Sequence, residues 1–120
     1  MKKLTEKNEI NNLVHSYFVH MQGRYFIEAL KSFSKAEGYG MEAVCCTFPK
    51  DYETWEEGYF GETGVMFSQS FPDESIAIVT NEEFYGYVSD AGDTFVNKFT
   101  ERKEEILEYL VAIKKILNIL

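Results

Sequence analysis

The chain has 120 residues and a formal net charge of −8, and hydrophobic residues make up 45% of it. This hydrophobic content is too high for a disordered chain, and the length suffices for about one domain with a real core. An acidic protein repels phosphate backbones, so the composition argues against direct nucleic-acid binding and favours a basic protein partner.

The N-terminus does not continue as a targeting segment. Lys2 and Lys3 resemble the start of a signal peptide, but polar and charged residues follow where the apolar region would have to lie. No apolar run approaches the roughly 18 residues that a membrane span needs. The sequence therefore predicts a cytoplasmic protein with no membrane segment.

Two helices are predicted before residue 38. In the first, over about residues 8–21, apolar residues recur at helical spacing: Ile10, Leu13, Val14, Tyr17, Phe18 and Met21. Gly23 interrupts this pattern, and a second helix follows with Phe26, Ala29, Leu30 and Phe33 on one face. His15 and His20 lie off the apolar stripe, so we expect surface histidines that share no ligand.

Three strands are predicted in the middle of the chain. They cover residues 41–48, 65–68 and 76–80, and Pro49 closes the first of them. The turn signal at residues 71–74 indicates an antiparallel hairpin between the last two strands. The third strand is apolar on both faces, so we expect it near the centre of the sheet.

Helices are predicted again at the C-terminal end. Asn81 is a good N-cap, with Glu82 and Glu83 in the first turn, and Phe84, Val88, Ala91, Phe95 and Phe99 mark the buried face. Thr100 is expected to cap a last helix with apolar residues at Ile106, Leu107, Leu110, Ile113 and Leu117. The fold class is α+β: a small antiparallel sheet of about three strands flanked by N-terminal and C-terminal helices, in one domain over residues 1–120.

No catalytic or metal-binding constellation is present in the sequence. Glu53 and Glu57 form the best carboxylate pair, but an acidic chain contains such pairs by chance. Residues 51–62 lack the alternating ligands of an EF-hand. Cys45 and Cys46 are neighbours that neither form an unstrained disulfide nor complete a zinc site, so we interpret them as small buried hydrophobes. We expect no enzymatic activity, cofactor or metal.

The distribution of charge carries the functional prediction. Between Glu37 and Asp93 there are 13 acids and a single base, Lys50, whereas the rest of the chain has a surplus of four bases. Soluble surfaces normally intersperse both signs, so we interpret this segment as a face that attracts a basic partner. Aromatic residues supply the usual energetic anchors of interfaces. The predicted partner-binding residues are Asp51, Tyr52, Glu53, Trp55, Glu56, Glu57, Tyr59, Glu62, Asp73 and Glu74.

Trp55 allows two interpretations. If it contacts the partner, its side chain is exposed in the free protein; alternatively it folds back into the core and the acids merely solvate a loop. The first interpretation is the one that we develop.

An ordered series of motifs resembles a known family. The motifs are RYFIEAL at 24–30, GYG at 38–40, CTFP at 46–49, GYFG at 58–61, GVMF at 64–67 and TNEEFYGY at 80–87. Over about residues 24–113 the chain resembles the ribonuclease toxin immunity proteins of bacterial contact-dependent growth inhibition systems. The resemblance implies a cytosolic, non-enzymatic antidote that binds one toxin domain and blocks its nuclease activity.

The charge pattern and the resemblance lead to the same prediction. A nuclease presents a basic groove to phosphates, so an acidic, aromatic-rich face is suited to cover it. We expect a monomer that forms a 1:1 complex with a cognate basic ribonuclease toxin domain. The alternative is an acidic adaptor or secretion chaperone, which would bind an extended or unfolded segment instead of a folded domain.

Overall fold

A computed structural model describes residues 2–41, 43–71 and 73–119 of the chain. Within them the chain alternates helices and short strands, with 3₁₀ turns at Pro49–Asp51 and Thr100–Arg102. In chain order the elements are β1 (Lys2–Lys3), α1 (Lys7–His20), α2 (Arg24–Phe33), β2 (Tyr39–Met41), β3 (Val44–Thr47), β4 (Val65–Gln69), β5 (Ser75–Val79), α3 (Asn81–Lys98) and α4 (Lys103–Ile116).

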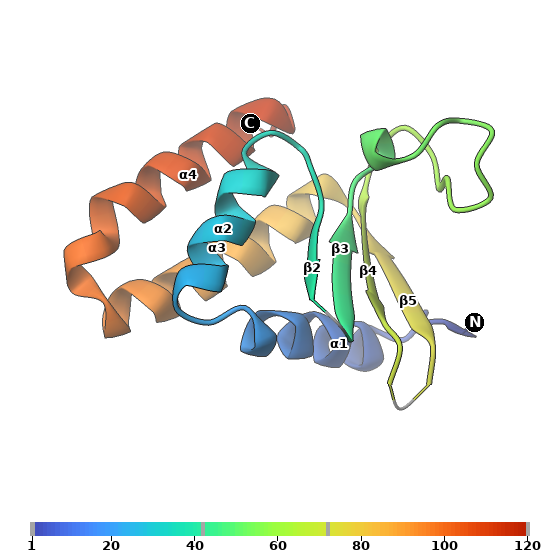
Figure 1. Ribbon diagram of the computed structural model, residues 1–120, viewed down its shortest axis with the longest axis horizontal. Helices are drawn as coiled ribbons and strands as arrows, with labels where there is room; N and C mark the ends of the chain where they lie inside the picture. The colour runs from blue at the N-terminus through green and yellow to red at the C-terminus, as the bar shows by residue number, and fades with distance from the viewer. Residues whose placement is uncertain (1, 42, 72, 120) are drawn as a thin grey trace.

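The strands form one sheet in the order β1-β5-β4-β3-β2. All neighbours are antiparallel except β1, which runs parallel to β5 (Figure 1). The α+β class is confirmed, but the sheet has five strands where the sequence predicted about three. β4 is the central strand and β5 lies beside it, between β4 and the edge strand β1, which agrees with the expectation that the strand at residues 76–80 lies near the centre.

The single strand predicted over residues 41–48 is a hairpin instead. β2 ends at Met41 and β3 begins at Val44, and these two residues are cross-strand partners. Glu42 lies outside the described residues, as does Pro72 of the predicted turn between β4 and β5. The prediction failed because no Gly, Pro or Asn marks the reversal of the chain between the two strands.

Both predicted caps of the C-terminal helices are displaced. Thr80, not Asn81, is the N-cap of α3: its Oγ1 accepts from the Glu83 amide at 3.0 Å, and Glu83 Oε1 accepts from the Thr80 amide at 2.8 Å. The Asn81 side chain instead accepts from the Gly64 amide at 3.1 Å, which ties the start of β4 to this helix. Thr100 opens a 3₁₀ turn, and α4 begins at Lys103 without a side-chain cap.

One face of the sheet packs against the helices. Cross-strand partners Cys46, Phe67 and Ala77 are buried on this face, where the Phe67 ring meets Tyr17 of α1 at a centroid distance of 5.2 Å. Figure 1 shows α2, α3 and α4 grouped to one side of the strands, with α1 running below them. Most residues of the N-terminal helical pattern are buried, namely Leu13, Val14, Tyr17, Met21, Phe26, Ala29, Leu30 and Phe33, whereas Ile10 and Phe18 are half-buried.

The opposite face of the sheet remains partly exposed. We call it the open face, and its side chains, which are all half-buried, belong to Cys45, Thr47, Met66, Ser68, Ile76 and Ile78. The strict alternation of buried and half-buried residues along β3 and β5 follows from the two-residue period of a strand.

Candidate functional site

The acidic loop, residues 51–62, leaves the sheet after β3 and returns to β4 (Figure 1). Asp51 fixes its first residue. One carboxylate oxygen accepts from the Phe48 amide at 2.7 Å and the other accepts from the Gly38 amide at 3.3 Å. A Cβ at Gly38 would lie 2.5 Å from the carbonyl oxygen of Cys46, so only glycine permits this approach. The structure thus gives the Asp51 carboxylate an internal role.

Aromatic packing closes the loop on itself. The Tyr52 and Phe60 rings meet edge to face with centroids 6.3 Å apart. Gly58 lies against the Tyr52 ring, where an added Cβ would be 2.6 Å from Cε1. Glu56 Oε1 accepts from the Glu53 amide at 2.8 Å. These contacts hold the two limbs of the loop together and leave its outer side chains directed into solvent.

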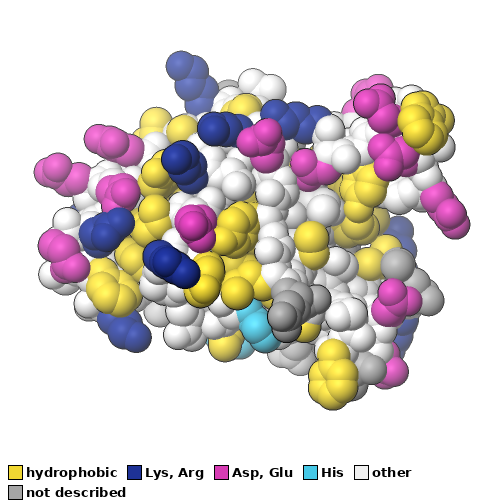
Figure 2. Space-filling view, in the orientation of Figure 1, with side chains coloured by type: hydrophobic (Ala, Val, Ile, Leu, Met, Phe, Trp, Pro, Cys, Tyr) yellow, Lys and Arg dark blue, Asp and Glu magenta, His cyan; other side chains and the backbone are white. Residues whose placement is uncertain are grey.

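Trp55 is the most exposed large hydrophobic side chain that the structure describes, at 81% of its full accessibility. The interpretation that it folds back into the core is therefore wrong. Glu53 and Glu57 beside it are also exposed, and Tyr59 is half-buried. Figure 2 shows acidic side chains gathered around a hydrophobic one on this projecting part of the surface. An exposed indole among carboxylates gives a surface both an apolar contact and a negative field.

The predicted site residues form two groups, not one. Asp73 and Glu74 are exposed in the turn between β4 and β5, at the end of the sheet away from the acidic loop. β4 separates the two groups, and a five-residue strand spans about 16 Å. Phe71, in the same turn, is 76% exposed and was not among the predicted site residues. The sequence signal for it was its place beside Pro72 in a turn, where a phenylalanine cannot reach the core.

The acids of the central segment lack basic partners. Across residues 2–41, 43–71 and 73–119 the ion pairs are Lys2 with Glu9 at 3.4 Å and Arg102 with Glu105 at 2.7 Å, and both lie outside residues 37–93. The negative charge of the acidic loop is therefore not neutralised within the described part of the molecule.

Sequence reasoning missed the residues that shape the loop. Gly38 contacts Asp51, and Gly58 and Phe60 contact Tyr52. The hydrogen bond between the Gly38 amide and the Asp51 carboxylate joins segments far apart in the chain. No local sequence pattern reveals such a contact. Gly58 carries a local signal, because a glycine among aromatics often marks a close approach.

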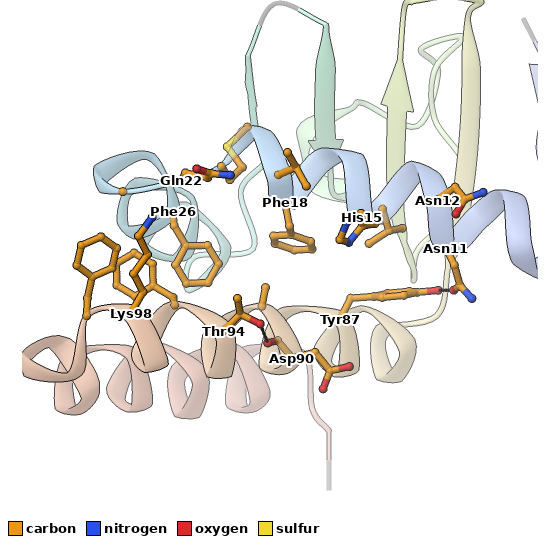
Figure 3. Close-up of a pocket in the computed structure, with 17 residues that line it drawn as sticks. Asn11, Asn12, His15, Phe18, Gln22, Phe26, Tyr87, Asp90, Thr94 and Lys98 are labelled. Atoms are coloured by element: carbon orange, nitrogen blue, oxygen red, sulfur yellow. Dashed lines mark hydrogen bonds between the residues drawn. The ribbon is translucent and has the colours of Figure 1, made fainter.

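A concave feature lies between α1 and α3, apart from the projecting acidic loop. It is a groove of about 620 Å³ with Phe18 and His15 on one side and Tyr87, Asp90 and Thr94 on the other (Figure 3). The Tyr87 hydroxyl donates to Asn11 Oδ1 across one end. His15 lines this groove, whereas His20 Nδ1 lies 2.7 Å from the Ser16 carbonyl oxygen of its own helix. The two histidine side chains therefore lie in different surroundings.

The groove and the cysteines offer no chemistry of an active site. Within the described residues, no three His, Cys, Asp or Glu side chains are grouped as metal ligands. Burial raises the pKa of the Cys46 thiol well above its ordinary value and raises that of Cys45 as well, so both thiols stay protonated and are weak nucleophiles. Cys46 is fully buried, as predicted, but Cys45 is half-buried on the open face. Nor is any described helix both long enough and apolar enough to span a bilayer.

Comparison with known proteins places the chain in a family. A family model described as CDI immunity protein matches residues 10–110, which run from within α1 to within α4. A comparison with curated proteins gave no match. Immunity proteins of this kind bind a cognate toxin and are not a class of enzymes. The match covers most of the chain and agrees with the unneutralised, projecting surface found here, and the chain belongs to the CDI immunity protein family.

Proposed function

We propose that this immunity protein neutralises a basic ribonuclease toxin domain in the cytoplasm by covering its substrate-binding surface. The observation that carries the proposal is the exposed Trp55 at the outer edge of a loop whose acids have no basic partner among the described residues. A ribonuclease binds the phosphates of its substrate with basic side chains, and a rigid array of carboxylates competes for the same surface.

The loop is suited to this role because its shape is set before binding. Ordering a mobile loop costs free energy on association, so contacts that fix the loop in the free protein favour affinity. Asp51, Tyr52 and Glu56 supply such contacts, which leaves Glu53, Glu57 and Glu62 exposed and available to the toxin. The complex is proposed to contain one copy of each protein.

The first prediction tests Trp55. We expect Trp55→Ala to keep its thermal midpoint, because an exposed side chain contributes little to folding. Binding to the cognate toxin domain should weaken by at least about 30-fold, corresponding to about 2 kcal/mol, mainly through faster dissociation. Surface plasmon resonance measures the rates, and protection of toxin-expressing cells gives the functional result.

The control is Val111→Ala on α4, another exposed apolar side chain, which should leave binding unchanged. A Trp55→Ala protein that melts early, or one that still protects fully, would contradict the proposal. Cleavage of total RNA by the isolated toxin, and its suppression by this protein, tests the ribonuclease part separately. Binding only to unfolded toxin would favour the adaptor or chaperone alternative.

A further inference from the structure

The open face connects the two groups of acids. The acidic loop borders it at one end, and the β4–β5 turn, with Phe71, Asp73 and Glu74, borders it at the other. Its middle is formed by half-buried apolar and small polar side chains such as Met66, Ser68 and Ile76, which carry no charge. An uncharged centre between charged, aromatic ends is the distribution found in protein–protein interfaces.

A small hollow lies on this face near the turn. Its volume is about 150 Å³, and Cys45, Ser68, Ile76 and Glu74 are among the residues that line it. Binding sites for small molecules usually measure about 300–1,000 Å³, so the hollow is better matched to one side chain of a protein partner. Glu74 is one of the residues that line the hollow, and it forms no ion pair within the described residues. A lysine or arginine can lay its aliphatic stem against Ile76 and place its charge at this carboxylate.

The size of the surface shows why both ends are needed. Four strands about 4.8 Å apart and about five residues long present roughly 300 Å² of sheet. A stable complex usually buries about 800 Å² on each partner. Neither the sheet nor the acidic loop reaches this area alone, but a partner that contacts the loop and the β4–β5 turn also covers the sheet between them.

We propose that the toxin domain docks across the open face, contacts the acidic loop and the β4–β5 turn together, and inserts one lysine or arginine side chain into the hollow beside Glu74. Charge complementarity assigns the occupant, because the acidic loop at one end of the face forms no ion pair among the described residues, and Asp73 and Glu74 lie at the other end. Lys2 and Lys3 flank the face on its edge strand β1, where Lys2 pairs with Glu9. This inference rests on the proposed function, since it takes the acidic loop to contact the same partner.

Charge reversal tests the hollow. Glu74→Lys and Glu108→Lys each change the net charge equally, and both side chains are exposed, but Glu108 lies on α4 away from the sheet. We expect Glu74→Lys to weaken toxin binding at least 10-fold and Glu108→Lys to have little effect at 0.15 M salt. Equal affinities of the two variants would overturn the inference.

Steric blocking tests the middle of the face. Ser68→Arg places a long cation between Cys45 and Ile76, its cross-strand neighbours, whereas Val111→Arg makes an equal charge change on α4. We expect at least a 10-fold loss of affinity for Ser68→Arg alone, with a thermal midpoint close to that of the wild type.

A measurement on the unaltered protein covers the case in which Ser68→Arg does not fold. Cys45 lies on the open face, and Cys46 is fully buried and serves as the internal control. Bound toxin should slow alkylation of Cys45 several-fold and leave Cys46 unlabelled. Unchanged Cys45 labelling would contradict docking over the face. If Cys45 labelling were unchanged but Trp55→Ala weakened binding, the proposed function would stand and only this inference would fail.

Discussion

Tyr17 and Cys46 are polar residues at the centre of an aromatic core. The Tyr17 hydroxyl donates to the Tyr39 carbonyl oxygen at 2.7 Å, and its ring contacts Phe18, Phe33 and Phe67. Burial raises the pKa of the Tyr17 hydroxyl far above 10.0, with repulsion from ionised Cys46 as a further cause, and burial raises the pKa of the Cys46 thiol well above 9.0, with repulsion from Cys45 and Asp51 as further causes. Both groups therefore remain neutral in the folded state.

The second prediction concerns stability at alkaline pH. Below about pH 9 the folded and the unfolded chain both keep the protons of Tyr17 and Cys46, so the stability is fully present. As the pH rises past the ordinary pKa values of these two groups, the unfolded chain releases protons that the folded chain retains, so the free energy of unfolding falls. The slope is on the order of 1 kcal/mol per pH unit for each group.

Urea unfolding between pH 8 and pH 10.5 measures this slope. Cys46→Ala should flatten it from about pH 9, and Tyr17→Phe should flatten it only above about pH 10. Both variants also lose stability at pH 8, so the change of slope, and not the starting value, is the relevant result. Slopes identical to the wild type in both variants would show that other groups dominate.

At the residue scale the sequence predicted the exposure of Trp55 but not the contacts of Asp51. Exposure of Trp55 was predicted because an indole beside glycines and acids has no apolar periodicity that would direct it to a core. Asp51 was predicted as a partner-binding residue, yet its carboxylate accepts from two backbone amides. That difference depends on a contact between residues 38 and 51, which only the folded chain brings together.

At the element scale, long periodic segments were predicted well and short ones were not. α1 and α2 begin and end within a few residues of their predictions, because a helical stripe of apolar residues is a strong signal over ten or more positions. β1 was missed because two exposed lysines carry no periodicity, and they form a strand only by pairing with Ser75 and Ile76. The cap at Thr80 was missed by one residue, although Thr80 and Glu83 match a capping box.

The third prediction concerns the acidic loop as an element. Asp51→Ala removes both acceptors at the base of the loop, so the loop should become more mobile in the free protein. We expect faster hydrogen exchange at the Gly38 and Phe48 amides and a several-fold loss of toxin affinity, because binding then includes the cost of ordering the loop. The loss of stability should be about 1 kcal/mol.

Asp51→Asn separates this role from direct contact with the toxin, since it keeps an acceptor oxygen but removes the charge. If Asp51 acts by holding the loop, Asn should preserve much of the slow exchange and of the affinity. Weak binding by Asp51→Asn with exchange as slow as in the wild type would assign Asp51 to the interface instead.

At the scale of the whole molecule, the acidic loop concentrates five acids and no base, whereas the helices carry charges of both signs. The molecule measures 41 × 30 × 24 Å, and Figure 1 places the acidic loop at one end of the longest axis and the start of α4 at the other. Figure 2 shows acidic and basic side chains intermixed over the helical end, whereas acids gather at the loop. The Debye length of about 10 Å at 0.1 M salt is short compared with the 41 Å extent of the molecule, so the loop acts as a local negative field.

The fourth prediction follows from this arrangement. A basic toxin approaching the protein is attracted by the acidic loop, whereas the helical end carries charges of both signs, so the field orients the encounter as well as accelerating it. We expect association at about 10⁸ M⁻¹s⁻¹ at low salt, falling toward the roughly 10⁵–10⁶ M⁻¹s⁻¹ of unsteered pairs as salt increases, while dissociation changes little.

Stopped-flow measurements over a range of salt concentrations distinguish orientation from net charge. Replacing Glu53 and Glu57 by Gln should slow association and reduce its dependence on salt. Replacing Lys114 and Lys115, which lie in the last turn of α4, by Gln changes the net charge by the same amount in the opposite direction. This pair of substitutions makes the protein more negative but leaves the acids of the loop intact. If only net charge mattered, Lys114→Gln with Lys115→Gln would accelerate association as much as the glutamate variants slow it. A steering field at the loop predicts instead that the lysine variants associate nearly as the wild type does, because their charges lie on α4 and the acids of the loop are unchanged. Association rates that depend on neither pair, or that do not respond to salt, would remove the electrostatic basis of the proposed function and leave Trp55 and the open face to account for binding.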